Sequence, residues 1–241
     1  MRSGISFDGE FRISFFVMPL FYQHNINEST KLGVWHIAEP EDFFLTQVSL
    51  QQEISHPHKR LQHLAGRYLL RFLFPEFPHE LIEIASTKKP FLPDEAFHFS
   101  ISHCGDYAAA IVSRSHRVGI DIEIPTPKVA RVRHKFLHTQ ELSIMENKNS
   151  IPPVFNSADE AVFLRKLTLL WSAKEAAFKW YGNGEVDFSH QIRIQPPGNK
   201  LSVPGEGTMH GMFLKEQSVS LTLPFVNFKE ICLVWVMTLP V

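Results

Sequence analysis

The chain has 241 residues, of which 44% are hydrophobic and 20% are charged, with a net charge of -1 and a pI of about 6.9. This composition is typical of a globular protein with a sizeable core. The balanced charge lacks the basic excess of proteins that bind nucleic acid or an acidic membrane, so we expect neither partner.

An apolar run near the N-terminus, Ile13–Phe21, follows Arg12. The run faintly resembles a signal peptide, but Asp8 and Glu10 precede it and no small-residue cleavage site follows. We therefore expect a buried strand there. No apolar run is long enough to span a membrane, and Cys104 and Cys232 are too far apart for a metal or disulfide motif. These features favour a cytoplasmic protein.

The next segments alternate between strand and helix patterns. Apolar spacing and Pro75 predict a helix over 58–74. Alternating or apolar runs on either side of the turn Cys104-Gly105-Asp106 predict strands. The expected strands of this half are 31–37, 97–102, 108–113 and 118–124.

Pro125-Thr126-Pro127 interrupts the pattern and suggests a boundary between subdomains 1–124 and 125–241. After an exposed loop over 147–156, Ser157 and Glu160 form a capping box, and Gly182 suits a helix end, so we expect a helix over 157–181. The segment from Phe188 onward predicts strands, most clearly 219–223 and 231–238. The predicted fold is α+β, with helices packed on an antiparallel sheet in each subdomain.

Asp121 and Glu123 are two residues apart on a predicted strand, so both project from the same face. Paired carboxylates repel unless a cation lies between them, and carboxylate oxygens suit Mg²⁺. From spacing alone, a solvated acidic strand face is the simpler explanation of the pair.

Glu175 and Lys179 are four residues apart on the helix over 157–181, with Trp171 one turn earlier on the same side. They fit either an exposed ion pair, or a metal ligand or base beside a phosphate-binding lysine.

Ser102 and His103 precede the turn at Gly105, where a hydroxyl, an imidazole and turn amides can hold a phosphate. A structural turn is the simpler explanation. The helix over 58–74 carries Arg60, Arg67 and Arg71 beside its apolar stripe, which suits either an anion or a solvated basic face. His56, His58 and His63 lack metal-site spacing and are expected at the surface.

Three segments in this order resemble the signature blocks of the 4'-phosphopantetheinyl transferases. They are HFSISHCG (98–105), VGIDIE (118–123) and WSAKEAAFK (171–179). Lys88-Lys89-Pro90 also resembles a Lys-Pro element of the family, although the family often has Gly where Lys88 stands. The chain length is similar to that of the monomeric class built from two subdomains. The resemblance covers roughly residues 65–184.

The resemblance implies a pair of similar α+β subdomains, related by a pseudo-twofold axis, with coenzyme A and Mg²⁺ in the cleft between them. It implies that Asp121, Glu123 and Glu175 bind magnesium and that Lys179 meets the pyrophosphate. The implied coenzyme A contacts are Lys89, Ser102 and His103, with a looser match for Arg67 and Arg60.

The implied reaction transfers phosphopantetheine from coenzyme A to a serine of an apo acyl or peptidyl carrier protein and releases 3',5'-ADP. Glu175 or a metal-bound water would serve as the base. Two alternatives remain open at this stage: a metal-dependent nucleotide phosphohydrolase, and a non-catalytic module that binds coenzyme A or a carrier. The segment 130–142 mixes Arg131, Arg133 and Lys135 with Phe136 and Leu137 and is our candidate surface for docking the carrier.

Overall fold

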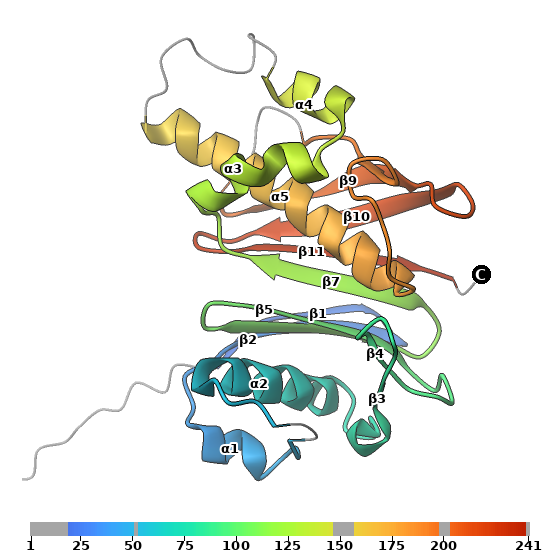
Figure 1. Cartoon of the computed structure of the whole chain (residues 1–241). Coiled ribbons are helices and arrows are strands. Elements are labelled where there is room, and N and C mark those ends of the chain that lie inside the picture. The colour runs from blue at the N-terminus through green and yellow to red at the C-terminus, as the bar shows by residue number, and fades with distance from the viewer. Residues whose placement is uncertain (1–18, 51–52, 147–156, 198–202, 240–241) are drawn as a thin grey trace, which may run out of the picture.

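The computed structural model describes residues 19–50, 53–146, 157–197 and 203–239. The fold is α+β with antiparallel sheets, as the sequence predicts. Two large sheets lie in the middle of the molecule, and the helices lie outside them (Figure 1).

The first sheet has the strand order β1-β2-β6-β5, and each neighbouring pair is antiparallel. Its outer face packs against the apolar side of helix α2 (Pro57–Leu73). The strands are β1 (Leu20–Asn27), β2 (Thr30–His36), β5 (His98–Cys104) and β6 (Tyr107–Ser113). The smaller elements are α1 (Glu41–Leu45), the 3-10 helix η1 (His79–Leu81), and the short hairpin of β3 (Glu83–Ile84) and β4 (Pro90–Phe91).

The second sheet has the order β7-β11-β10-β9-β8 and is also antiparallel. Helix α5 (Ser157–Tyr181) crosses its outer face, and α3 and α4 lie near α5 (Figure 1). The strands are β7 (Arg117–Glu123), β8 (Ile192–Ile194), β9 (Gly205–Phe213), β10 (Val219–Asn227) and β11 (Cys232–Thr238). The remaining helices are α3 (Pro127–Phe136) and α4 (Thr139–Glu146).

Three apolar clusters hold these layers together. One joins α2 to the first sheet, and a second joins α5 to the second sheet. The third lies between the sheets, where Leu32 and Ile111 of the first sheet share a cluster with Ile120, Ile122 and Leu233 of the second. The isoleucines of β7 therefore point into this middle core, so the acids that alternate with them face the side of α5.

Helix α5 lies directly against β7 at Gly119. A Cβ at this position would lie 2.1 Å from the carbonyl oxygen of Ala176 and 2.7 Å from the backbone nitrogen of Trp180. Only a residue without a side chain permits this approach. Gly119 thus fixes how closely α5 can bring its side chains to β7.

The structure confirms the predicted helices over 58–74 and 157–181 and the strands around the turn at Gly105. It differs for β7, which pairs with β11 of the second sheet rather than with a strand of the first. The sheets therefore separate ahead of β7, while the subdomain division at 124 and 125 stays a prediction. The loop expected over 147–156 and most of the strand expected over 13–21 lie outside the described residues.

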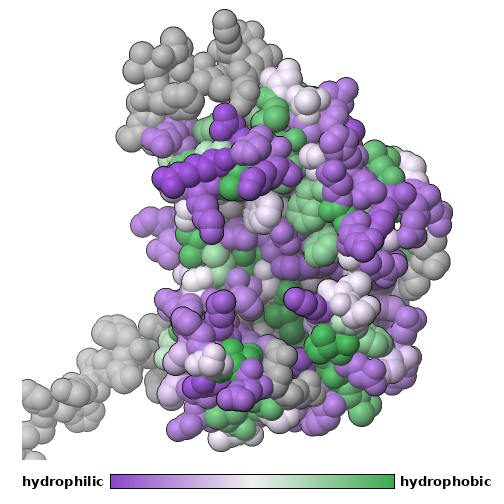
Figure 2. Space-filling model, viewed as in Figure 1, coloured by the Kyte–Doolittle hydropathy of each residue, from purple (hydrophilic) through white to green (hydrophobic). Residues whose placement is uncertain are grey.

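The segment 130–142 is largely helical, and two of its apolar residues are buried. Phe136 and Leu137, which we expected to contact a carrier, are only 1% and 2% exposed and belong to the core under α5. The docking expectation for these two residues is therefore wrong. On the face seen in Figure 2, hydrophobic residues form separate patches among hydrophilic ones. None of the helices in the described ranges is long and apolar enough to cross a membrane.

Candidate active site

The site lies where β5 and β7 run side by side as the facing edges of the two sheets. The Ser100 hydroxyl accepts a hydrogen bond from the Ile120 backbone N–H at 3.2 Å, which links the two strands. Two residues further along, the Ser102 hydroxyl donates to Asp121 Oδ1 at 2.8 Å. Because serines alternate along β5, both hydroxyls face β7.

Asp121 is the centre of this arrangement and is only 2% exposed. Its Oδ1 accepts from Ser102 and also from the Lys179 ammonium of α5, at 2.6 Å. Its Oδ2 is buried and has no hydrogen-bond partner within the described residues. A buried carboxylate oxygen without a partner is costly, so the site fits an additional donor or cation at this point.

Glu123 is held by two side-chain donors. Trp171 of α5 donates its indole N–H to Oε1 at 3.1 Å, and the Cys104 thiol lies 3.4 Å from Oε2. Burial raises the pKa of Glu123 above its ordinary value, and the neighbouring Asp121 raises it further. The two acids are therefore close enough to repel, and neither belongs to a solvated strand face.

Glu175 lies half-buried on α5, one turn before Lys179. Burial raises the pKa of Glu175 to about 7, with further upward contributions from Asp121 and Glu123 and an opposing one from Lys179. The ion pair of Lys179 runs to Asp121 on β7. This helix therefore contributes to a shared cluster rather than to an isolated ion pair on an exposed face.

The cluster has the carboxylate ligands that a magnesium site needs, but their oxygens are not yet placed around a common point. In the part of the chain that the structure describes, no group of three or more His, Cys, Asp and Glu side chains is already placed to hold a metal ion. In this structure the Lys179 ammonium donates to an oxygen of Asp121, and the Trp171 indole donates to an oxygen of Glu123. However, three mutually repelling carboxylates and the unpartnered Asp121 Oδ2 fit a hard cation that takes oxygen ligands.

A basic cluster adjoins the acids across β5. His103 lies at the surface, and partial desolvation of its ring lowers its pKa, with a further lowering by the nearby Lys179. His63 of α2 receives a hydrogen bond from the Arg67 guanidinium at 3.0 Å, and its pKa falls to about 4 because of burial, Arg67 and His103. Arg67 is only 3% exposed, and its Nη1 is buried with no hydrogen-bond partner among the described residues. This cluster fits an anion.

The basic helix face predicted from the sequence does not form as one surface. Arg60 pairs with Glu41 at 2.7 Å, and Arg71 donates to the Gln47 carbonyl, whereas Arg67 turns inward. His63, which we expected at the surface, is half-buried beside Arg67, so that expectation is wrong. The only sequence signal for the contact between His63 and Arg67 was their spacing, because they are four residues apart on one helix face.

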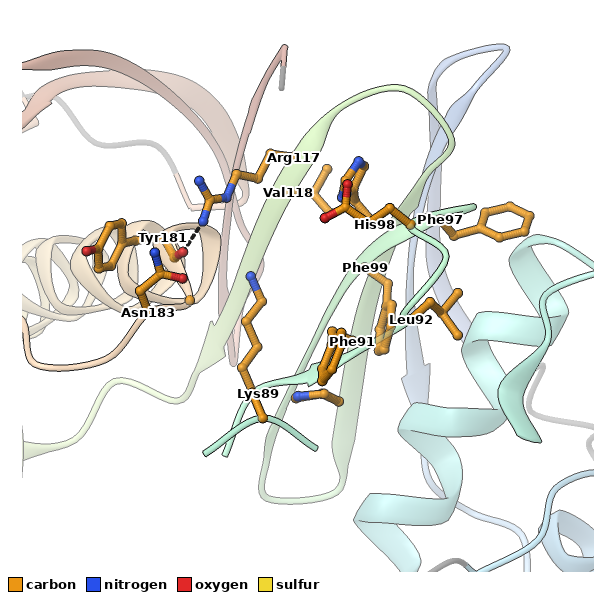
Figure 3. A pocket seen from close by; sticks show the side chains of 14 residues that line it. Lys89, Phe91, Leu92, Phe97, His98, Phe99, Arg117, Val118, Tyr181 and Asn183 are labelled. Atoms are coloured by element: carbon orange, nitrogen blue, oxygen red, sulfur yellow. Dashed lines mark hydrogen bonds between the residues drawn. The ribbon is translucent and has the colours of Figure 1, made fainter. Parts of the chain in front are cut away.

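Lys89 lies away from the acids, in a pocket of about 410 Å³ that is lined by residues of the segment 85–99, of β7 and of the end of α5. Its neighbours there include His98 and Arg117, at the starts of β5 and β7, and Tyr181 at the end of α5 (Figure 3). Burial lowers the pKa of Lys89 to about 8, with a smaller contribution from Arg117. The structure thus unites Ser102, His103, Asp121, Glu123, Glu175 and Lys179, with Arg67 adjacent and with Lys89 and Arg60 apart.

Comparison with known proteins agrees with the resemblance noted in the sequence. Residues 117–211 match the family model described as the 4'-phosphopantetheinyl transferase superfamily. The chain is 37% identical over 126 residues to enterobactin synthase component D of Escherichia coli (strain K12). The aligned region covers 50% of this chain and 54% of that protein. It is 30% identical over 133 residues to the 4'-phosphopantetheinyl transferase AcpT of Escherichia coli O157:H7, covering 55% and 64%. The chain spans about half the length of the first curated relatives it matches.

Proposed function

We propose that the protein is an enzyme which transfers phosphopantetheine from coenzyme A to a carrier-protein serine, starting from the match of residues 117–211 to the 4'-phosphopantetheinyl transferase superfamily. The observation that carries the proposal is the meeting of Asp121 and Glu123 of β7 with Glu175 and Lys179 of α5. All four lie inside the matched segment. They adjoin a basic cluster suited to the phosphates of coenzyme A.

Asp121, Glu123 and Glu175 are the residues that would hold Mg²⁺. Their support is chemical: the set is all carboxylate, and one buried oxygen of Asp121 has no partner in the described structure. When bound, the ion would neutralise charge on the pyrophosphate as phosphoryl transfer proceeds.

The chain's own side chains supply the other requirements of the reaction. Lys179 would place its ammonium against the reacting phosphate, with the Ser102 hydroxyl beside it. Glu175, with its pKa raised to about 7, is suited to accept the proton of the carrier serine at neutral pH. The serine oxygen then bonds to the phosphorus of the phosphopantetheine, and the bond to 3',5'-ADP breaks.

The basic cluster is our candidate for the remaining phosphate of coenzyme A, and we expect His103 to contact the 3'-phosphate. Replacing His103 with Ala should then weaken coenzyme A binding by about 1.5–3 kcal/mol. The variant should bind 3'-dephospho-coenzyme A as wild type does. Calorimetric titration of both ligands measures this difference. Equal losses for the two ligands would remove His103 from that role.

A groove next to Glu175 is our candidate for the approach of the carrier. It is lined by Trp171 and Phe188, by Val132 and Lys135 of α3, and by Glu175 itself. Apolar walls with a lysine at the rim suit a small acidic helical domain. We further propose that the enzyme is a cytoplasmic monomer, since both cysteines are free thiols and both acid-bearing elements come from one chain.

Incubation with coenzyme A, MgCl₂ and an apo carrier protein tests the proposal, with intact mass of the carrier as the readout. A gain of one phosphopantetheine group supports it. Phosphate release without a carrier would favour the nucleotide phosphohydrolase. Tight coenzyme A binding without turnover of any acyl or peptidyl carrier would favour a non-catalytic module.

A further inference from the structure

The last turn of α5 is held by side chains from two other segments of the chain, the residues before β4 and the start of β7. The final carbonyl groups of a helix have no partner within the helix. Here Arg117 donates to the Tyr181 carbonyl, and the Thr87 hydroxyl donates to the Gly182 carbonyl at 2.9 Å. The Lys89 ammonium lies 3.5 Å from the Trp180 carbonyl oxygen. Three successive carbonyls therefore meet donors from the segment before β4 and from the start of β7.

Packing reinforces these hydrogen bonds. Gly182 has a φ of +76°, and a Cβ there would lie 2.5 Å from both Cδ and Nζ of Lys89, so the lysine lies directly over the helix end. The Arg117 guanidinium lies 5.3 Å from the centre of the Trp180 ring. Two cations at a helix C-terminus also oppose the negative end of the helix dipole. In Figure 3, Lys89 extends upward from the segment before β4, and its ammonium ends to the right of Asn183 and below Arg117.

The position of this helix end matters because α5 carries Glu175 and Lys179 just before it. The Lys179 ammonium lies 2.6 Å from Asp121 on β7, so a small shift of the last turn separates these groups. The contacts at the helix end fix the position of α5 along its axis, and Gly119 sets its distance from β7.

We propose that Lys89, Thr87 and Arg117 form a clasp that positions the end of α5, and that Lys89 acts on the reaction through Lys179 and Glu175. This inference rests on the proposed transferase function and deepens it. The family resemblance gives Lys89 a contact with coenzyme A instead. A positioning residue affects turnover at saturating coenzyme A, whereas a ligand contact affects coenzyme A affinity.

The test compares Lys89→Met and Thr87→Val with Lys88→Met. The control removes a charge from the neighbouring residue, whose side chain is exposed. Three quantities are measured: amide hydrogen exchange in the ligand-free protein, the coenzyme A Kd by calorimetry, and kcat for carrier modification. We expect both clasp variants to speed exchange in the last turn of α5 and to lower kcat by roughly ten- to hundredfold, with Kd unchanged within about twofold. Lys89→Arg should keep most of the wild-type kcat.

Weaker coenzyme A binding by Lys89→Met, with unchanged kcat and unchanged exchange in α5, would make Lys89 a ligand contact and overturn the clasp. Unchanged exchange and turnover in Thr87→Val would also overturn it, and this variant decides the matter if Lys89→Met does not fold. A wild-type protein that modifies no carrier would refute the proposed function. The exchange comparison would still decide whether Lys89 and Thr87 hold the end of α5.

Discussion

The three acids differ in their hydrogen-bond partners and in the surroundings that shift their pKa values. Asp121 has two hydrogen-bond donors on one oxygen, and Glu123 is held by Trp171 and Cys104. Glu175 keeps a raised pKa because of burial and its two acidic neighbours. A carboxyl group with a pKa near neutrality is suited to exchange a proton, which is the property that the proposed role of Glu175 requires.

Replacing any of these acids by its amide should remove charge while keeping shape. We expect Asp121→Asn, Glu123→Gln and Glu175→Gln each to lower the transfer rate by on the order of 10²-fold or more. Carrier modification followed by mass spectrometry measures the rate, and circular dichroism checks the fold. Glu83→Gln, at an exposed position, is the matched control. Wild-type rates in any two of the three variants would contradict the site.

The raised pKa of Glu175 makes stability depend on pH in a defined direction. Its ordinary value is 4.5 and its folded value is about 7, so the folded state holds the proton more tightly. Its contribution is therefore fully present at low pH and is lost as pH rises through about 7. In metal-free protein, the fall in Tm between about pH 5.5 and about pH 8 should be smaller for Glu175→Gln than for wild type. Equal falls would mean that another group titrates.

At the scale of elements, the approach of α5 to β7 depends on Gly119. A methyl group there meets backbone atoms of α5, which cannot rotate away. We expect Gly119→Ala to destabilise the protein by about 1–3 kcal/mol and to lower transfer activity as α5 moves from β7.

Gly33→Ala is the control for this substitution, because its nearest contact, at 3.3 Å, is the flexible end of Leu73. Chemical denaturation measures both losses. A Gly119→Ala protein as stable and active as the control would show that α5 can shift without consequence.

Sequence patterns predict the elements whose signals are local. The capping-box pattern and Gly182 predict where α5 begins and ends, and alternation predicts β7 with its two acids. Patterns do not predict which strand β7 pairs with, or that Lys179 reaches Asp121, because both depend on contacts between distant segments. The inward turn of Arg67 escaped prediction for the same reason. Burial of Phe136 likewise depends on how α3 lies against α5.

For the whole molecule, the proposed carrier surface follows from the groove beside Glu175. Lys135 is exposed at its rim, so Lys135→Glu should raise the KM for an acidic carrier and leave the coenzyme A Kd unchanged. The effect should shrink as salt rises, because exposed charges are screened within about 10 Å at 0.1 M. Steady-state kinetics at low and high salt measure this.

Lys128→Glu makes the same charge change on α3 at an exposed position that does not line the groove. It should leave the carrier KM near the wild-type value. Equal effects of the two substitutions, or none from Lys135→Glu at low salt, would move carrier docking away from this groove.

The pairing of β7 with β11 also determines when the site can assemble during synthesis. On the ribosome, α2 and all four strands of the first sheet emerge before β7 does. β7 cannot pair with β11 until α3 to α5 and β8 to β10 have been translated. Throughout that interval the nascent chain carries Asp121 and Glu123 on an unpaired strand edge, which is open to wrong pairing. The residues proposed for catalysis are thus among the last to reach their places.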